Sequence, residues 1–268
     1  MADSNEFQFF WSEGPLPWIS QLCLRSFTRY SGVTVHLYSY DRDLDPGISG
    51  CVCHDASEYL PREIHERVKS SFGGRYGGGF GYSEGADLFR YRLLYEKGGW
   101  YFDTDCLLIK PLTPLFDRDY VFGWKNATRV NNAVLKFPKG DAMLDQLYKE
   151  CIQRRPETCQ PTTVPLFTQY LSKFDLIDRA LPREYFYAID WMEQQQSPLE
   201  EHQYILHLYA STREPRFQAQ FDPQIKSLER QIASLNLQIE MLNKSLGLRI
   251  ARKIPFGKEI RKVLVKDD

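Results

Sequence analysis

Residues 98–110 read GGWYFDTDCLLIK, and two carboxylates, Asp103 and Asp105, stand one residue apart between two apolar runs. Burying an isolated carboxylate is unfavourable unless it is paired or binds a cation. Two acids at positions i and i+2 face the same side as long as the backbone stays extended, and together they suit a hard divalent cation. The segment therefore predicts a buried strand that ends at the carboxyl edge of a sheet, where open α/β folds bind their ligands.

The surrounding sequence predicts an α/β sheet. EFQFFW (6–11) and TVHLYSY (34–40) predict strands, and the apolar residues of WISQLCLRSFTRY between them have helical spacing. A strand, a helix and a strand in such a short stretch are the opening of an α/β sheet. Further strands are expected at 120–125, 131–137, 185–189 and 204–210, and helices at 55–69, 86–99, 140–153 and 163–174.

The stretch SFGGRYGGGFGYSEG (71–85) contains seven glycines, which predicts an irregular segment. No predicted strand leads into it, so it does not have the context of a dinucleotide-binding loop. A mobile lid over a bound ligand is the hypothesis for this segment, because glycine-rich segments near sites often close on binding.

Composition narrows the classes of function. The 268 residues carry a formal net charge of −1. This argues against a nucleic-acid partner, because a protein that binds nucleic acid needs a basic face. No apolar run is long enough to span a bilayer, and the first residues lack the pattern of a secretory signal, so a cytoplasmic location is expected. Six cysteines without zinc-type spacing favour free thiols over a disulfide or metal framework.

The C-terminal part differs from residues 1–215, which are expected to form one domain. Apolar residues recur in steps of three and four from Ile225 to Leu246, which is a heptad pattern. The pattern predicts either a coiled coil over 222–246, with a homo-oligomer formed through 225–246, or a helix that docks on its own domain.

The last segment, 247–268, is basic and amphipathic. One interpretation is that 247–266 bind an anionic membrane surface, which would place the protein peripherally on the inner face of the membrane. The alternative is a solvated tail, and Pro255 and Gly257 forbid one continuous helix in either case.

The run ADLFRYRLLYEKGGWYFDTDCLLIKPL (86–112) resembles the DXD-containing glycosyltransferases with the GT-A fold. That group includes yeast-type mannosyltransferases, bacterial capsule sugar transferases and the large clostridial glucosylating toxins. Weaker matches lie at FFW (9–11), NNAVL (131–135) and ILHLYAS (205–211). The resemblance implies an α/β domain of the GT-A type, Rossmann-like, with a mixed central sheet flanked by helices. The heptad pattern adds a C-terminal helical coiled-coil extension to this expected fold.

The resemblance implies that two acids and a late histidine hold a cation. Asp105 would ligate the metal directly, and Asp103 would contact the donor ribose and the metal, directly or through water. His207 would complete the metal shell or bind the diphosphate, because a neutral imidazole nitrogen suits a borderline metal such as manganese. From the sequence alone, His207 can equally be a satisfied core histidine.

The same resemblance implies a set of donor contacts. Asp87 and Arg90, which are three residues apart and so share one helical face, would hold the sugar hydroxyls and the diphosphate. Trp11 would cover the base, and Asn132 or its neighbour Asn131 would face the sugar. The alternatives are a helix cap for Asp87, a surface ion pair for Arg90 and core packing for Trp11.

The implied function is metal-dependent transfer of a sugar, with retention of configuration, from a UDP- or GDP-sugar to a glycan or lipid-linked glycan. Mn²⁺ or Mg²⁺ is the expected cofactor. Asp105, Asp103 and Arg90 are expected to act in catalysis by stabilising the leaving diphosphate. No protein base is named, because the departing phosphate oxygen can take the acceptor proton.

Two other functions fit parts of the sequence. A phosphatase of the haloacid dehalogenase type also has an apolar strand followed by Asp-x-Asp, and KGDAMLD (139–145) imitates its later acidic motif. Against it, Leu107 stands where that family has Thr or Val, and the two motifs are too close for the intervening sheet. A coiled-coil adaptor with a degenerate transferase domain would bind no nucleotide and would self-associate through 225–246.

Overall fold

The computed structural model describes residues 6–29, 33–76, 78–154, 164–188 and 202–209, together with Met241. The chain divides into two compact units, Met1–Thr212 and Arg213–Asp268. Apart from Met241, the predicted coiled coil or docking helix and the predicted basic tail lie outside the described residues, so both stay predictions.

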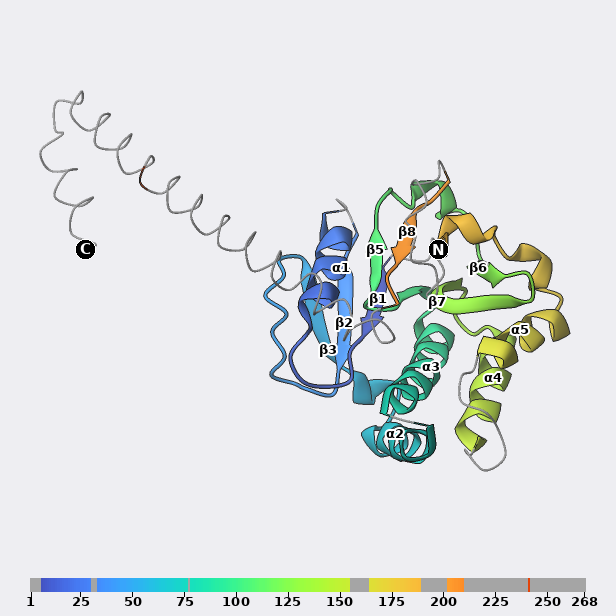
Figure 1. Ribbon diagram of the computed structural model, residues 1–268, viewed down its shortest axis with the longest axis horizontal. Coiled ribbons are helices and arrows are strands. Elements are labelled where there is room, and N and C mark those ends of the chain that lie inside the picture. Colours follow the sequence, from blue (N-terminus) through green and yellow to red (C-terminus); the bar gives the residue numbers. More distant parts are fainter. Residues whose placement is uncertain are drawn as a thin grey trace, which may run out of the picture. The chain divides into compact units, whose positions relative to one another are not determined.

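A six-stranded sheet with the order β3-β2-β1-β4-β7-β6 organises the first unit (Figure 1). Its strands are β1 (Phe7–Phe10), β2 (Val35–Ser39), β3 (Cys51–Asp55), β4 (Gly99–Phe102), β6 (Val121–Asn126) and β7 (Arg129–Phe137). The pairs among β1 to β4 are parallel, whereas β7 is antiparallel to both β4 and β6. The predicted mixed α/β sheet is confirmed, and its parallel strands bring their carboxyl ends to one edge.

Two short strands form a separate antiparallel ribbon beside this sheet, β5 (Cys106–Leu108) and β8 (Ile205–His207). The helices are α1 (Trp18–Thr28), α2 (Arg62–Tyr76), α3 (Gly78–Lys97), α4 (Ala142–Gln153) and α5 (Val164–Lys173). Single 3₁₀ turns lie at Ala56–Glu58, Thr113–Leu115, Ile177–Arg179 and Arg183–Tyr185.

Side chains alternate along the strands and so divide the core into two layers. On one face of the sheet, Phe10 of β1 stacks on Phe89 of α3 with ring centroids 4.2 Å apart. On the other face, Phe9 of β1 and Phe102 of β4 pack around Phe27 of α1. Helices therefore cover both faces, as the alternating strand and helix pattern predicts.

The prediction of an irregular segment over 71–85 is wrong, because α2 and α3 take up most of it and lie side by side (Figure 1). The glycines allow this close packing. A Cβ atom added at Gly81 would lie 2.2 Å from the Lys69 carbonyl oxygen of α2, and one at Gly85 would lie 2.4 Å from the His65 ring. Glycine serves here for close helix approach and not for a turn.

The strand predicted at 185–189 is also wrong for its described part, because Arg183–Tyr185 is a 3₁₀ turn and Phe186–Ala188 pair with no strand. Phe186 and Tyr187 are nevertheless fully buried. These aromatic residues suggested a strand because aromatic side chains are common in strands, where they pack against a half-buried surface. Here the same side chains fill the core without forming a strand.

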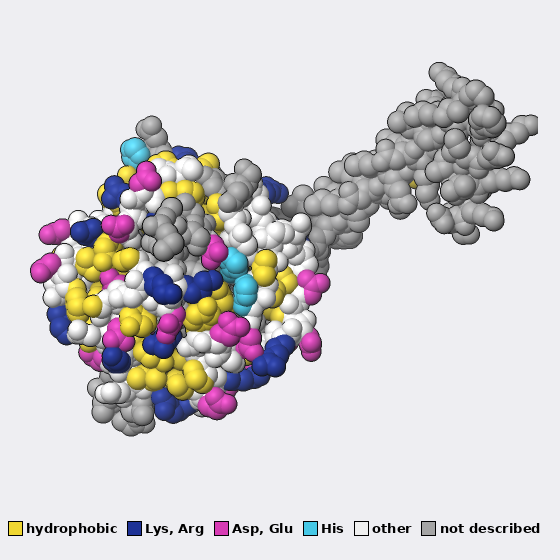
Figure 2. Space-filling model, turned by 180° about the vertical axis from the view of Figure 1, so that it is seen from behind, with side chains coloured by type: hydrophobic (Ala, Val, Ile, Leu, Met, Phe, Trp, Pro, Cys, Tyr) yellow, Lys and Arg dark blue, Asp and Glu magenta, His cyan; other side chains and the backbone are white. Residues whose placement is uncertain are grey.

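The surface of the first unit mixes charges of both signs. Figure 2 shows Lys and Arg interspersed with Asp and Glu, with no single-sign field over the face that it presents. In the part of the chain that the structure describes, no helix combines the length and the apolar character that a bilayer crossing requires.

Candidate active site

The junction between α3 and β4 fixes where the two acids lie. Gly98 and Gly99 have φ angles of 70° and 85°, which glycine adopts without strain. The Gly98 N–H donates to the Leu94 carbonyl and ends α3, and β4 begins at the next residue. Because α3 runs antiparallel to β4, its N-terminal half lies beside the carboxyl end of that strand, where Asp103 follows Phe102.

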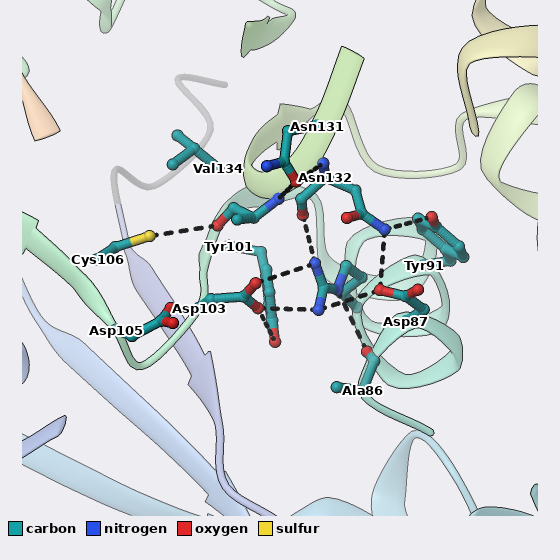
Figure 3. A network of polar contacts seen from close by, with 12 residues as sticks. Ala86, Asp87, Tyr91, Tyr101, Asp103, Asp105, Cys106, Asn131, Asn132 and Val134 are labelled. Carbon is teal, nitrogen blue, oxygen red and sulfur yellow. Dashed lines mark hydrogen bonds and ion pairs between the residues drawn. The ribbon is translucent and has the colours of Figure 1, made fainter. Parts of the chain in front are cut away.

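Asp103 and Asp105 do not continue the strand. The Cys106 N–H donates to the Asp103 carbonyl at 3.0 Å, which closes a turn over these residues before β5 begins. The extended geometry that would place both acids on one side is therefore absent. Figure 3 shows the result, with Asp103 between Asp87 on one side and Asp105 and Cys106 on the other.

Asp103 pairs with a buried arginine from α3. Arg90 Nη2 lies 2.8 Å from one Asp103 oxygen and 3.1 Å from an Asp87 oxygen, and the Arg90 side chain is only 4% exposed. Arg90 Nη1 also donates to the Asn132 carbonyl at 2.6 Å. The guanidinium lies over the Tyr101 ring at 4.9 Å, and the Tyr101 hydroxyl donates to Asp103. This burial rules out the surface ion pair that was the alternative for Arg90.

Asp87 and Asn132 extend the cluster toward β7. Asn132 Nδ2 donates to both Asp87 and the Tyr91 hydroxyl at 2.8 Å (Figure 3). Asp87 lies in the middle of α3, so it does not cap that helix. Asn131 Oδ1 instead accepts from the backbone N–H groups of Asn132 and Ala133. Of the two predicted asparagines, the side chain of Asn132 is the one that contacts the Asp87 cluster.

Burial and charge act against each other in this cluster. The pKa of Asp103 is raised to about 6, because burial and the nearby Asp105 charge raise it more than the Arg90 guanidinium lowers it. Burial disfavours the charged form of Arg90, but the carboxylates of Asp103 and Asp87 outweigh it and raise the pKa of Arg90 well above its ordinary value. Two carboxylates, those of Asp87 and Asp103, pair with one guanidinium, and Asp105 adds a third negative charge nearby. A bound cation would offset the remaining negative charge.

Asp105 lies against a second group from a distant part of the chain. β8 pairs with β5 so that His207 is directly opposite Cys106, and the Leu208 N–H donates to the Asp105 carbonyl at 3.0 Å. His207 Nε2 lies 3.1 Å from an Asp105 oxygen. One ligand atom each from Asp105, Cys106 and His207 all lie within 4.8 Å of one another.

The surroundings of His207 fit a metal better than a core role. Both ring nitrogens are buried, and within the described residues neither has a hydrogen-bond partner. The Asp105 oxygen is close to Nε2 but not aligned for a hydrogen bond, an arrangement that suits two ligands sharing one cation. Tyr209 and Tyr187 pack against the ring at 4.0 and 5.7 Å between centroids. A carboxylate, an imidazole and a thiol form a donor set that a borderline divalent metal accepts.

Trp11 follows β1 at the same edge of the sheet as Asp103, because β1 and β4 are parallel neighbours. Its backbone N–H donates to the Tyr38 carbonyl, and its indole N–H donates to the Gly14 carbonyl at 3.0 Å. The indole packs in part against the core on the α1 side and remains half-buried. This placement is compatible with a base-covering role and with partial core packing.

The structure thus divides the predicted residues into two neighbouring groups. Asp87, Arg90, Asp103 and Asn132 form one hydrogen-bonded cluster, whereas Asp105 and His207 form the other. Cys106 joins the second group and was missed by sequence reasoning. The sequence carries only a weak signal for Cys106, because it is the cross-strand pairing with His207 that places the thiol beside Asp105.

Residues 67–122 match a family model described as the glycosyltransferase sugar-binding region containing DXD motif. This segment includes Asp87, Arg90, Asp103, Asp105 and Cys106. No curated protein matches the chain by sequence.

Three solved structures illustrate the likeness to known folds. PaToxG glycosyltransferase is 14% identical, with 64% of this chain and 69% of that chain covered and a TM-score of 0.46. Glycosyltransferase GlyE of Streptococcus pneumoniae TIGR4 is 14% identical, with coverage of 76% and 55% and a TM-score of 0.45, so this chain spans about half its length. The galactosyltransferase LgtC, solved with donor and acceptor sugar analogues, is 12% identical, with coverage of 75% and 86% and a TM-score of 0.44.

The family match falls on the helix, turn and strand that carried the predicted resemblance. It confirms the resemblance and the predicted enzyme class. Residues 67–122 of this chain therefore resemble the DXD-containing sugar-binding region of glycosyltransferases.

Proposed function

We propose that this chain transfers a sugar from a nucleoside-diphosphate sugar to a hydroxyl of a glycan or lipid-linked glycan, with a divalent cation at Asp105 and His207. UDP- and GDP-sugars are the proposed donors, and Mn²⁺ or Mg²⁺ is the proposed cation. The observation that carries the proposal is the buried His207 ring, whose nitrogens have no hydrogen-bond partner among the described residues and whose Nε2 lies 3.1 Å from Asp105 of the matched region.

The cation would supply positive charge to the diphosphate as its bond to the sugar breaks, which is the main source of catalysis in such reactions. The chain's own residues orient the donor. Arg90 holds Asp103 and Asp87 in place through ion pairs with both, and its bond to the Asn132 carbonyl fixes the guanidinium. Its burial favours this positioning role over direct contact with the diphosphate, which the resemblance implied.

Asp87 and Asn132 are the proposed contacts for the sugar hydroxyls, and Asp103 the contact for the ribose. Asp103 can also reach the cation through water. For transfer with retention, the acceptor would attack from the side of the leaving group, and a diphosphate oxygen would take the acceptor proton. This arrangement requires no basic side chain, and none is assigned.

The structure weakens the phosphatase alternative. The first acid of the later phosphatase-like motif, Asp141, caps α4 by accepting from the Leu144 N–H at 3.0 Å and accepts a further bond from the Tyr120 hydroxyl. Asp141 also follows β7, which runs antiparallel to β4. It therefore lies at the opposite edge of the sheet from Asp103 and Asp105.

The test is a panel of UDP- and GDP-sugars incubated with the protein in Mn²⁺, Mg²⁺ or a chelator, with release of the nucleoside diphosphate as the readout. Release with at least one donor, and none with chelator, is expected. Asp105→Asn should lower this rate by about a hundredfold or more, because it weakens binding of the cation that stabilises the leaving diphosphate. Asp145→Asn, in α4, where Asp145 pairs with Lys149 away from the site, is the matched control and should keep the rate. Near-normal release by Asp105→Asn would defeat the assignment.

A further inference from the structure

We propose that the thiolate of Cys106 is a third protein ligand of the cation, so that the site prefers Zn²⁺, Co²⁺ and Mn²⁺ to Mg²⁺. The proposal rests on the proposed function for the existence of the cation site. It adds a ligand that the Asp-x-Asp pattern does not include and a metal preference that follows from it.

The backbone places the thiol beside the other two ligands. Cys106 and His207 are directly opposite each other in the β5–β8 ribbon, and side chains of such a pair lie on the same face. Asp105 immediately precedes Cys106, and the turn that starts at Asp103 brings its carboxylate back over the ribbon. One ligand atom from each of the three residues lies within 4.8 Å of the other two.

The neighbouring groups leave the thiol available. Its only described hydrogen bond is a long one, from Sγ to the Ala133 carbonyl at 3.8 Å. The two His207 nitrogens next to it are buried without hydrogen bonds in the described part of the chain, which is costly unless something binds them. Asp103, in contrast, is held by Arg90 at 2.8 Å and faces the other way. Asp103, the first acid of the motif, is therefore turned away from the proposed cation, and Cys106 takes the ligand position that Asp103 would otherwise fill.

Ligand chemistry gives the expected preference. Thiolate and imidazole favour borderline and soft cations, whereas Mg²⁺ requires oxygen ligands. On binding, the S–H proton of Cys106 passes to solvent and the sulfur donates an electron pair to the metal, so charge and protons balance. The remaining coordination positions stay open for diphosphate oxygens.

Two of the other described cysteines provide controls. Cys151 in α4 is a buried thiol like Cys106, but it belongs to the core layer on the opposite face of the sheet. Cys53 in the edge strand β3 is exposed. Neither is part of the Asp105–Cys106–His207 group, so neither should affect the cation at that site.

The experiment titrates the full-length protein with Co²⁺ alone and records the sulfur-to-metal charge-transfer absorption. The band should saturate at one equivalent in the wild type, in Cys151→Ser and in Cys53→Ser, and should be absent in Cys106→Ser. Zn²⁺ affinity should fall at least about tenfold in Cys106→Ser, with Mg²⁺ affinity unchanged. X-ray absorption of the Zn²⁺-loaded wild type should show one sulfur at about 2.3 Å, which tests the proposal even if the variant fails to fold.

The outcomes separate this inference from the proposed function. If Co²⁺ binds with nitrogen and oxygen ligands only, and Asp105→Asn abolishes binding while Cys106→Ser does not, the thiolate proposal is overturned and the cation site stands. If no divalent metal binds to the wild type, with or without UDP or GDP, both are wrong.

Discussion

Asp103 and Asp105 are separated by a single residue, yet they have different partners. Asp103 is held by Arg90 and Tyr101, whereas Asp105 lies against His207. The residue types and spacing predicted a cation site at this point of the chain. The divergence of the two side chains could not be predicted, because it depends on a turn whose hydrogen bond joins backbone atoms. Any of several residue types would allow that turn.

Arg90 is the residue on which the first cluster depends. Replacing Arg90 with Ala leaves the buried Asp87 and the partly buried Asp103 without their positively charged partner. Such a loss typically costs about 3–5 kcal/mol of unfolding free energy. Arg92→Ala is the matched control in the same helix, since Arg92 forms a partly exposed i,i+4 pair with Glu96. That change should cost about 1 kcal/mol or less. Urea unfolding followed by circular dichroism measures both, and equal losses would contradict the buried ion-pair network.

Glu84, one turn before Asp87 in α3, predicts a dependence of stability on pH. Burial, with Asp87 adding to it, raises the pKa of this carboxyl to about 8. The folded protein therefore retains a proton that the unfolded chain loses above about pH 4.5. Stability contributed by Glu84 should be present below that pH and should fall as pH rises toward 8, by up to about 1.4 kcal/mol per pH unit.

Glu84→Gln keeps the shape of the side chain and cannot ionise. Its unfolding free energy should therefore change less between pH 5 and 8 than that of the wild type, and the variant should be the more stable protein at pH 8. Glu63→Gln, at the exposed start of α2, is the control and should leave the wild-type profile in place. A Glu84→Gln profile parallel to the wild-type one would show that this carboxyl titrates normally.

Among the secondary-structure elements, α2 and α3 show most clearly what a sequence pattern leaves open. Helices and strands with regular apolar spacing were predicted close to their observed bounds, as at Val35–Ser39 and Ala142–Gln153. The helices in the glycine-rich stretch 71–85 were not predicted. Glycine favours turns, but it also lets two helices approach closely, and only the position of the partner backbone decides between these roles. Phe186 and Tyr187 show a similar ambiguity, because their aromatic side chains are buried by surrounding residues although they lie in no strand.

Two glycine substitutions test the packing of α2 against α3. A Cβ at Gly81 would meet the Lys69 carbonyl oxygen at 2.2 Å, so Gly81→Ala must push the helices apart. The expected cost is about 1–3 kcal/mol of unfolding free energy. Gly74, also helical, has nothing within 4 Å of an added Cβ, and Gly74→Ala should stabilise by about 0.5–1 kcal/mol. Denaturant unfolding of both variants gives the comparison, and a neutral Gly81→Ala would show that the close approach is absent.

Taken over the whole first unit, the candidate site is assembled from five parts of the chain: the end of β1, the middle of α3, the β4–β5 turn, the start of β7 and β8. The resemblance named Asp87, Arg90, Asp103, Asp105 and His207 as candidates, because each lies in a recognisable local pattern, but it did not name Cys106. It could not predict which of them touch. The Asn132–Asp87 and Asp105–His207 contacts join residues that are far apart in sequence. The pairing of β5 with β8 creates the second contact, and no local pattern encodes that pairing.

Because the site draws on so many segments, binding of nucleotide and cation should stabilise the unit as a whole. A ligand present at about a hundred times its dissociation constant adds about 2.7 kcal/mol to the unfolding free energy. For a unit of this size we expect a rise in Tm of about 5–10 °C. UDP or GDP with Mn²⁺ should produce this shift, and a chelator should abolish it.

The same measurement distinguishes a metal-held diphosphate from simple nucleotide binding. In Asp105→Asn the shift should be lost, because the cation no longer joins the nucleotide to β8, whereas Asp145→Asn should keep it. Differential scanning fluorimetry of the full chain records all of these conditions. A shift of equal size with nucleotide alone, or one that survives in Asp105→Asn, would mean that the nucleotide is held by Trp11 and the Asp87 cluster without help from a cation at Asp105.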